Sequence, residues 1–355
     1  MNDRLSAAAA AEAYVGLPRP LFTRLPFDYR RIPEGVRSRF LAAATAFARK
    51  APPFPMWPIE ETIDVAPSGL DYSGHRFGLV LTHDIDSRVE LDLIEPIRAH
   101  ERSLGLSTSW GFVPEGSWPS AGLAESLVDE GCQVYWHDLT HDGRIPWMSA
   151  AELRARIDAI DKRFPWARAI TTFRSGQLLM SGPLMDAIAG RFRIDMSIPD
   201  SERGGPYGSV VGCGSVVPFR FRGLLELPMS MPQDYYLERV MGLDAGSIFD
   251  LWTAKIEHIA RVGGVAVLNA HPVWINPVHQ PRSAMWSMYR KFLEVTTSRR
   301  DVLVSTPDGI ESIVARHVGK GRGESPAVLE HASQAPTAPG TRPGLRAGPG
   351  REDIR

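Results

Sequence analysis

From residue 77 to about residue 318 the sequence alternates between short apolar runs and amphipathic segments, and this alternation most restricts how the chain can fold. Strands that alternate with helices favour a parallel sheet, open or closed, and seven or eight parallel strands fit an α/β fold of the TIM-like (β/α) barrel type. Strands are predicted at 78–82, 106–112, 132–136, 168–173, 192–197, 224–230, 264–269 and 302–305. Helices are predicted at 149–164, 181–191, 247–262, 283–298 and 307–318.

Three regions depart from this alternation. Residues 1–75 are rich in proline and aromatic residues and predict an extension packed on the barrel, with one helix at 38–50; a lid over one end of a site is the alternative. Residues 200–218 form a glycine-rich loop, either a mobile surface loop or one that covers a substrate. Residues 319–355 lack apolar periodicity and predict a disordered tail after a catalytic domain at 76–318.

The composition excludes several classes of protein. A formal net charge of −1 gives no basic surface for nucleic acid, and two cysteines exclude a disulfide framework and favour reducing surroundings. No run of apolar residues is long enough to predict a membrane span. No signal peptide is recognisable, so a cytoplasmic location is expected. The sequence leaves the oligomeric state open.

Two aspartates and two histidines follow predicted strands. Asp84 and Asp86 come directly after an apolar run, and buried carboxylates are costly without a cation, a hydrogen-bond network or a proton-transfer role. In an extended chain they point to the same side, roughly 6.5–7 Å apart. His137 and His141 have a spacing that puts both imidazoles on one face of a helix or turn. Two histidines and one carboxylate make an open site for Zn²⁺ or a similar divalent ion, and two polar loop residues are the alternative.

Three further polar residues lie at strand ends. Arg174, Asp195 and His271 supply a cation, an acid and a titratable imidazole. Hydrolysis of an amide or ester needs activated water, a base, an oxyanion stabiliser and a proton donor. Each has a structural alternative: a surface ion pair for Arg174, a helix or loop cap for Asp195 and a core position for His271.

Glu226 and Asp234 are candidate substrate contacts or solvated loop residues. Four tryptophans near the motifs are either core residues or platforms for a sugar ring: Trp110, Trp136, Trp147 and Trp274.

The order of these motifs resembles the polysaccharide deacetylase family of carbohydrate esterases. That family has a strand ending Thr-Phe-Asp-Asp-Gly, then His-x-x-x-His, an arginine motif and a final strand leading to a histidine. The corresponding segments here are Leu81-Thr-His-Asp-Ile-Asp86, His137-Asp-Leu-Thr-His141, Phe173-Arg-Ser-Gly176 and Leu268-Asn-Ala-His-Pro-Val-Trp274. The resemblance covers residues 76–310 and implies a distorted barrel of seven or eight strands. It also implies metal-dependent hydrolysis of N-acetyl or O-acetyl groups.

The resemblance implies a role for each candidate residue. Asp84 resembles the general base, and Arg174 resembles the residue that orients it. His271 resembles the general acid, with Asp195 as the candidate partner that keeps it charged and oriented. The residues that resemble the metal ligands are Asp86, His137 and His141. Because Ile85 separates the two aspartates, as in a Thr-x-Asp-x-Asp variant of the family, which of them binds the metal stays open.

The sequence therefore predicts a cytoplasmic, metal-dependent deacetylase. Its expected cofactor is Zn²⁺, with Co²⁺, Fe²⁺ or Ni²⁺ as alternatives. Its expected partner is a small-molecule or glycan-type acetylated substrate such as an amino sugar. Two rival hypotheses for the function remain. The first is hydrolysis of another C–N bond, as in a cyclic amide or ureide. The second is a non-catalytic barrel that binds a glycan or a partner.

Overall fold

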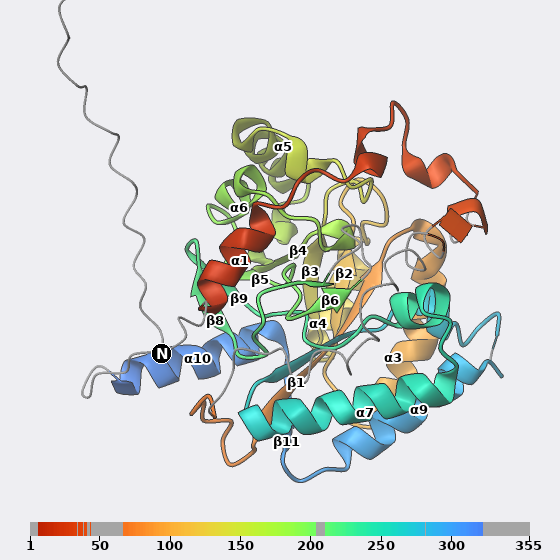
Figure 1. The fold of residues 1–355 in the computed structure, drawn as a ribbon, viewed down its shortest axis with the longest axis vertical. Coiled ribbons are helices and arrows are strands. Elements are labelled where there is room, and N and C mark those ends of the chain that lie inside the picture. The colour runs from red at the N-terminus through yellow and green to blue at the C-terminus, as the bar shows by residue number, and fades with distance from the viewer. Residues whose placement is uncertain are drawn as a thin grey trace, which may run out of the picture.

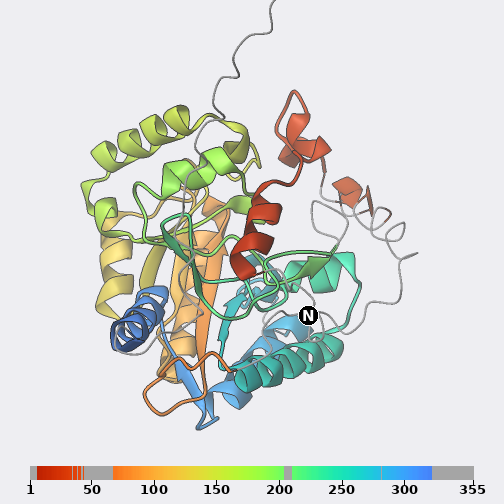
Figure 2. The ribbon, with the colours of Figure 1, turned by 60° about the vertical axis from the view of Figure 1, so that its left-hand side comes forward.

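A computed structural model describes residues 6–33, 35–37, 39–40, 43, 67–203, 210–280 and 282–321. Within these residues a nine-stranded, mostly parallel sheet curls through the middle of the molecule with helices around it (Figure 1, Figure 2). Its strands are β1 Phe77–Ile85, β2 Ser109–Phe112, β3 Gln133–His137, β4 Thr172–Arg174, β5 Ile194–Asp195, β8 Phe219–Phe221, β9 Leu224–Glu226, β10 Val265–Asn269 and β11 Val302–Val304. The predicted α/β fold, a distorted TIM-like barrel, is confirmed.

The strand order is β10-β1-β2-β3-β4-β5-β9-β8, and β11 pairs with the first residues of β1. All eight predicted strands exist. β4 is shorter than predicted, because residues 165–169 form a turn of 3₁₀-helix ahead of it. No strand is predicted at β8, which runs antiparallel to β9. The other strands of this sheet pair in parallel, so their carboxyl ends meet at one end of the sheet, where barrel enzymes build their sites.

The barrel closes between β9 and β10 through a side chain. The Ser230 hydroxyl donates to the carbonyl of Val265 at 2.6 Å and accepts from the backbone N–H of Val267 at 2.9 Å. One backbone bond follows, from Met231 N–H to the Val267 carbonyl at 3.1 Å. Among the described residues no strand ladder joins β9 to β10, so this seam distorts the barrel.

The helices lie around the outside of the sheet (Figure 1). The main helices are α1 Ala7–Val15, α3 Ile94–Ser103, α4 Ala121–Asp129, α5 Ala150–Arg163, α6 Gly182–Ile188, α7 Ala245–Val262, α8 Pro272–Ile275, α9 Ala284–Thr297 and α10 Pro307–Gly321. Ser149 caps α5 by accepting from the Glu152 N–H at 3.2 Å. The predicted start of α7 at Ser247 is wrong, because Asp244 is its N-cap and accepts from the Ser247 N–H at 2.7 Å.

Strand alternation divides the buried side chains into two layers. Val80, Tyr135, Ile194 and Leu225 belong to an inner cluster, to which α10 adds three residues: Ile310, Ile313 and Val314. A larger outer cluster lies between the sheet and the helices and includes Leu79, Leu81, Trp110, Trp136 and Phe173. The layer into which a strand residue points thus decides whether it can reach the site.

Part of the predicted N-terminal extension packs on loops that follow β3 and β4. The Tyr14 hydroxyl donates to the Leu178 carbonyl at 2.6 Å, and Arg144 Nη2 donates to the Leu25 carbonyl at 2.9 Å. Most of the helix expected at 38–50 lies outside the described residues, as does the tail from residue 322. In the glycine-rich loop, β6 Glu202–Arg203 pairs with β7 Val210–Val211. Within the described chain, no helix is both long and apolar enough to span a membrane.

Candidate metal centre and active site

Asp84, the last residue but one of β1, is buried among hydrogen-bond donors. Its Oδ1 accepts from the Tyr135 hydroxyl and from Arg174 Nη1, the latter at 3.2 Å. Its Oδ2 accepts from Asn269 Nδ2 at 2.7 Å. Arg174 is fully buried, and its Nη1 also lies 2.9 Å from both Thr82 Oγ1 and the Tyr135 hydroxyl. The carboxylate is therefore fixed from three strands.

These surroundings decide the charge of Asp84. Burial is the largest influence on the pKa of Asp84 and disfavours the ionised form. The positive charges of His137, Arg174 and His271 oppose that effect, and the resulting pKa is lowered below its ordinary value. Asp84 is therefore a buried carboxylate that stays ionised at neutral pH.

Asp86, two residues further along the chain, meets both histidines. Its Oδ1 lies 3.1 Å from His137 Nε2 and 3.3 Å from His141 Nε2. Burial opposes ionisation of Asp86, but His141 and His137 outweigh it and lower the pKa of its carboxyl group. The candidate ligand atoms of these three residues lie within 4.8 Å of one another. Two imidazole nitrogens and one carboxylate oxygen converging in this way fit a divalent ion of the zinc type.

The backbone around the arginine motif orients His137. His137 Nδ1 lies 3.3 Å from the Arg174 carbonyl, an acceptor that holds a proton on Nδ1. Nε2 is then the nitrogen left to bind an ion, and it lies 3.1 Å from Asp86 Oδ1, near the other imidazole. A metal-binding histidine usually has its second nitrogen fixed by such a partner.

Gly176 makes room for the histidine loop. A Cβ at this position would lie 2.3 Å from Asp138 Oδ2 and 2.9 Å from His141 Cδ2. Asp138 and His141 both have positive φ angles, of 62° and 56°, which non-glycine residues rarely adopt. The glycine that follows Arg174 and Ser175 therefore lets a strained loop bring His141 next to His137.

His271 is held by Asp234 and not by Asp195. Its Nδ1 lies 2.6 Å from Asp234 Oδ1, and its backbone N–H donates to Asp234 Oδ2 at 2.8 Å. Its Nε2 lies 3.2 Å from Asn269 Nδ2, the group that also contacts Asp84. Burial lowers the pKa of His271, but the Asp234 carboxylate outweighs it and raises that pKa to about 10. The imidazole is accordingly held in its charged form.

The predicted pairing of Asp195 with His271 is wrong for a geometric reason. Ile194 and Met196 on either side of Asp195 belong to the inner cluster, so Asp195 points outward. There Asp195 Oδ1 accepts from Ser197 Oγ at 2.5 Å, and Asp195 lies opposite Glu226 in the β5–β9 ladder. Glu226 is also fully buried and accepts from the Ile198 N–H at 3.0 Å. Neither carboxyl group faces the metal cluster.

Three residues of the site have no predicted role there. Asp234 is predicted as a substrate contact or a solvated loop residue, because it lies in an irregular segment where no periodicity indicates its pairing with His271. Tyr135 lies within a predicted strand, and strand alternation puts it on the same side as His137. Asn269 precedes His271 by two residues, which is the signal that could have identified it. Of the four tryptophans, Trp110 and Trp136 are fully buried core residues.

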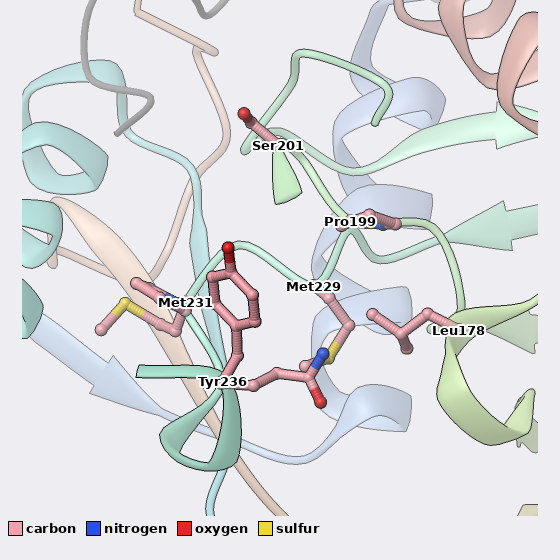
Figure 3. Close-up of a pocket in the computed structure, with 8 residues that line it drawn as sticks. Leu178, Pro199, Ser201, Met229, Met231 and Tyr236 are labelled. Atoms are coloured by element: carbon pink, nitrogen blue, oxygen red, sulfur yellow. The ribbon is translucent and has the colours of Figure 1, made fainter. Parts of the chain in front are cut away.

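A small apolar pocket lies at the same end of the sheet. It measures about 10 Å³, which is room for one small group, and loops after β4, β5 and β9 form it. Figure 3 shows the side chains around it: Leu178, Pro199, Ser201, Met229, Met231 and Tyr236. Gln233, which also lines it, directly precedes Asp234. The pocket is therefore adjacent to the residue that holds His271.

The fold is similar to that of several solved structures. A protein from Mycobacterium smegmatis described as a polysaccharide deacetylase superposes with a TM-score of 0.54 at 16% identity, covering 77% of this chain and 100% of that one. A protein from Pseudomonas aeruginosa PAO1 with the same description gives 0.51 at 11% identity, covering 68% and 92%. Puue allantoinase gives 0.50 at 11% identity, covering 69% and 92%.

This chain thus has the polysaccharide deacetylase fold, as its motifs predicted. A scan against protein-family models finds no matching model. A search of the curated proteins finds no matching sequence. At identities of 16% or less the structural likeness establishes the fold, and the function has to be argued from the site.

Proposed function

We propose that this protein is a metal-dependent hydrolase that removes the acetyl group of an N-acetylated amino sugar or related glycan-type substrate. The observation that carries the proposal is the convergence of a ligand cluster with two groups that can move protons. Asp86, His137 and His141 form the cluster. Asp84 and His271 lie next to it, and Asn269 Nδ2 donates to Asp84 Oδ2 and lies 3.2 Å from His271 Nε2. A barrel that only binds a glycan gives no reason for this arrangement.

Asp86, His137 and His141 would hold the ion, and Zn²⁺ suits two imidazoles and one carboxylate, as do Co²⁺, Fe²⁺ and Ni²⁺. When bound, such an ion polarises the scissile carbonyl and lowers the pKa of water. Asp86 is favoured over Asp84 as the ligand because its oxygen lies near Nε2 of both histidines. Asp84 Oδ1 is engaged instead by Arg174 and Tyr135.

Asp84 would act as the general base. Its lowered pKa keeps it ionised, so it can take a proton from the attacking water. Oδ2 accepts a hydrogen bond from Asn269 and has a second lone pair for that proton. Arg174 and Tyr135 hold Oδ1, which fixes the direction in which Oδ2 points.

His271 would act as the general acid. An amide leaving group needs a proton before it can depart, because an amide anion is far too basic to leave at neutral pH. Asp234 occupies Nδ1 and keeps the ring charged, so Nε2 is the nitrogen that can deliver the proton. Nε2 lies on the Asn269 side, towards Asp84. Base and acid thus face the same space.

The apolar pocket supports a small acyl group. A space of about 10 Å³ holds one water-sized group and excludes a long acyl chain, and Leu178, Met229 and Met231 give it apolar walls beside Ser201 and Gln233.

The test is to load the full chain with Zn²⁺ and to measure acetate release from a panel of N-acetylated amino sugars. Acetate release that depends on a divalent ion supports the proposal. Full activity in a His137→Ala variant, or no release from any substrate, would contradict it.

A second candidate is the hydrolysis of a cyclic amide or ureide. The similarity to Puue allantoinase motivates it, since that enzyme shares this fold. The same base, acid and ligand cluster can serve either reaction. Measuring ring-opened product and acetate in parallel separates the two candidates.

A further inference from the structure

His83 is a buried histidine that the mechanism above does not use. It lies between Thr82 and Asp84 on β1, where the deacetylase motif has phenylalanine, and it is fully buried. Because alternate strand residues point to opposite faces, its ring lies in the outer layer, behind Asp84. There it stacks on Trp110 with ring centroids 4.3 Å apart.

Both ring nitrogens of His83 contact acceptors. Nδ1 lies 2.6 Å from the Ala270 carbonyl oxygen, and Nε2 lies 2.7 Å from Glu101 Oε1. Glu101, on α3, also accepts from the Tyr289 hydroxyl at 2.6 Å and from Thr108 Oγ1 at 3.0 Å. A carbonyl can only accept, so Nδ1 donates to Ala270. Nε2 faces the Glu101 carboxyl group, which joins His83, Thr108 and Tyr289 in one buried hydrogen-bond network.

The hydrogen bonds of His83 join the two segments that carry the candidate base and acid. His83 directly precedes Asp84, and its acceptor Ala270 directly precedes His271. The Ala270 N–H donates to the Thr82 carbonyl at 3.0 Å, so Ala270 is tied to β1 on two sides. α3 and α9 supply Glu101 and Tyr289, which hold the His83 ring in place. The network therefore spans two helices and both catalytic strands.

We propose that His83, with Glu101, is a positioning residue that fixes the separation between Asp84 and His271; this role rests on the proposed hydrolase function. Burying the polar side chains of His83 and Glu101 costs desolvation energy that offsets most of what their hydrogen bond contributes, so net stability does not account for the pair. Proton transfer depends steeply on geometry, and a misplacement of about 1 Å can cost roughly 10²-fold in rate. His83 does not touch the reacting atoms and acts through the residues that follow it and its acceptor.

The first arm of the test compares His83→Phe and Glu101→Gln with a control. His83→Phe restores the aromatic side chain of the family motif, and Glu101→Gln keeps the size of the side chain if the first variant does not fold. The control is Asp161→Asn, which breaks the part-buried ion pair between Asp161 on α5 and Arg191, a pair outside the His83 network. We expect both site variants to keep their metal and to lose about 10- to 10²-fold in kcat with little change in KM. The control should lose thermal stability only.

The second arm does not depend on turnover. In protein labelled with ¹⁵N-histidine, His83 should show a hydrogen-bonded Nδ1–H proton, which disappears in His83→Phe. The His271 ring signals, assigned by their loss in His271→Ala, should shift in Glu101→Gln and stay unchanged in Asp161→Asn. If kcat and the His271 signals both remain as in the unmodified chain, the positioning role is wrong. If the unmodified chain releases no acetate, the hydrolase proposal fails while the His271 signals still decide whether His83 positions it.

Discussion

Both oxygens of Asp234 are committed to His271: Oδ1 lies 2.6 Å from the ring Nδ1, and Oδ2 accepts from the backbone N–H of His271 at 2.8 Å. The Asp234 carboxylate thus influences the charge of the His271 ring and also fixes the position of the His271 backbone. A residue 37 positions earlier in the chain thereby controls the candidate acid.

Asp234→Asn should weaken the acid. Without the carboxylate the pKa of His271 falls from its raised value, so the protonated ring is lost at lower pH. We expect turnover of an amide substrate to drop by roughly 10²- to 10⁴-fold and the basic limb of its pH profile to move to lower pH. An aryl acetate, whose leaving group needs little protonation, should lose much less. Equal losses on both substrates would mean that Asp234 has only a structural role.

The metal roles of Asp84 and Asp86 can be separated by substitution. His137→Ala removes one candidate ligand and should bring the metal content, measured by elemental analysis, close to zero. Asp84→Asn should keep the metal and lose activity, because Asn cannot accept the proton. A metal-free Asp84→Asn protein would reverse the assignment and make Asp84 the ligand.

Gly176→Ala should disturb the metal centre without touching a ligand. The added Cβ would meet Asp138 Oδ2 at 2.3 Å and His141 Cδ2 at 2.9 Å, so the histidine loop has to move. We expect metal affinity, measured by competition with a chelator, to fall by about 10- to 100-fold. Gly122→Ala in α4 is the matched control, because its Cβ would meet nothing within 4 Å. The prediction fails if the two variants bind metal equally well.

Asp195 and Glu226 should make stability depend on pH. Burial is the main cause that raises the pKa of Asp195 to about 6, and burial together with the neighbouring carboxyl raises the pKa of Glu226 well above its usual value. Groups with raised pKa values stabilise the fold when protonated, and this contribution is lost as pH rises through the folded values. The melting temperature should therefore fall as pH rises from about 4, where unfolded carboxyl groups ionise, through about 6 for Asp195 and further for Glu226.

The double variant Asp195→Asn, Glu226→Gln isolates this effect. It has no carboxyl group to ionise at this position, so its melting temperature should change less over the same pH range than that of the unmodified chain. Parallel curves for the two proteins would show that these two carboxyl groups do not cause the pH dependence.

Much of the barrel could be predicted because its strands are apolar runs with polar residues at their ends. Asp84, Asp86, His137 and His141 were recognisable since each follows such a run. Asp195 was misassigned because β5 is buried on both faces, and an apolar run on either side does not indicate which face a carboxyl group occupies. Asp234 lies in an irregular segment after β9, where no periodicity fixes the direction of a side chain.

The Ser230 seam has a consequence for how such a protein can diversify. The strands that carry the candidate ligand His137 and the candidate base Asp84 are joined by regular ladders, whereas the segment just after β9 is joined to β10 through the Ser230 hydroxyl and one backbone bond from Met231. Insertions and substitutions beyond β9 can therefore accumulate without disrupting a continuous ladder. Because the pocket-lining residues Met229 and Met231 flank this serine, the shape of the pocket can change there while the candidate site residues on β1 and β3 keep their places.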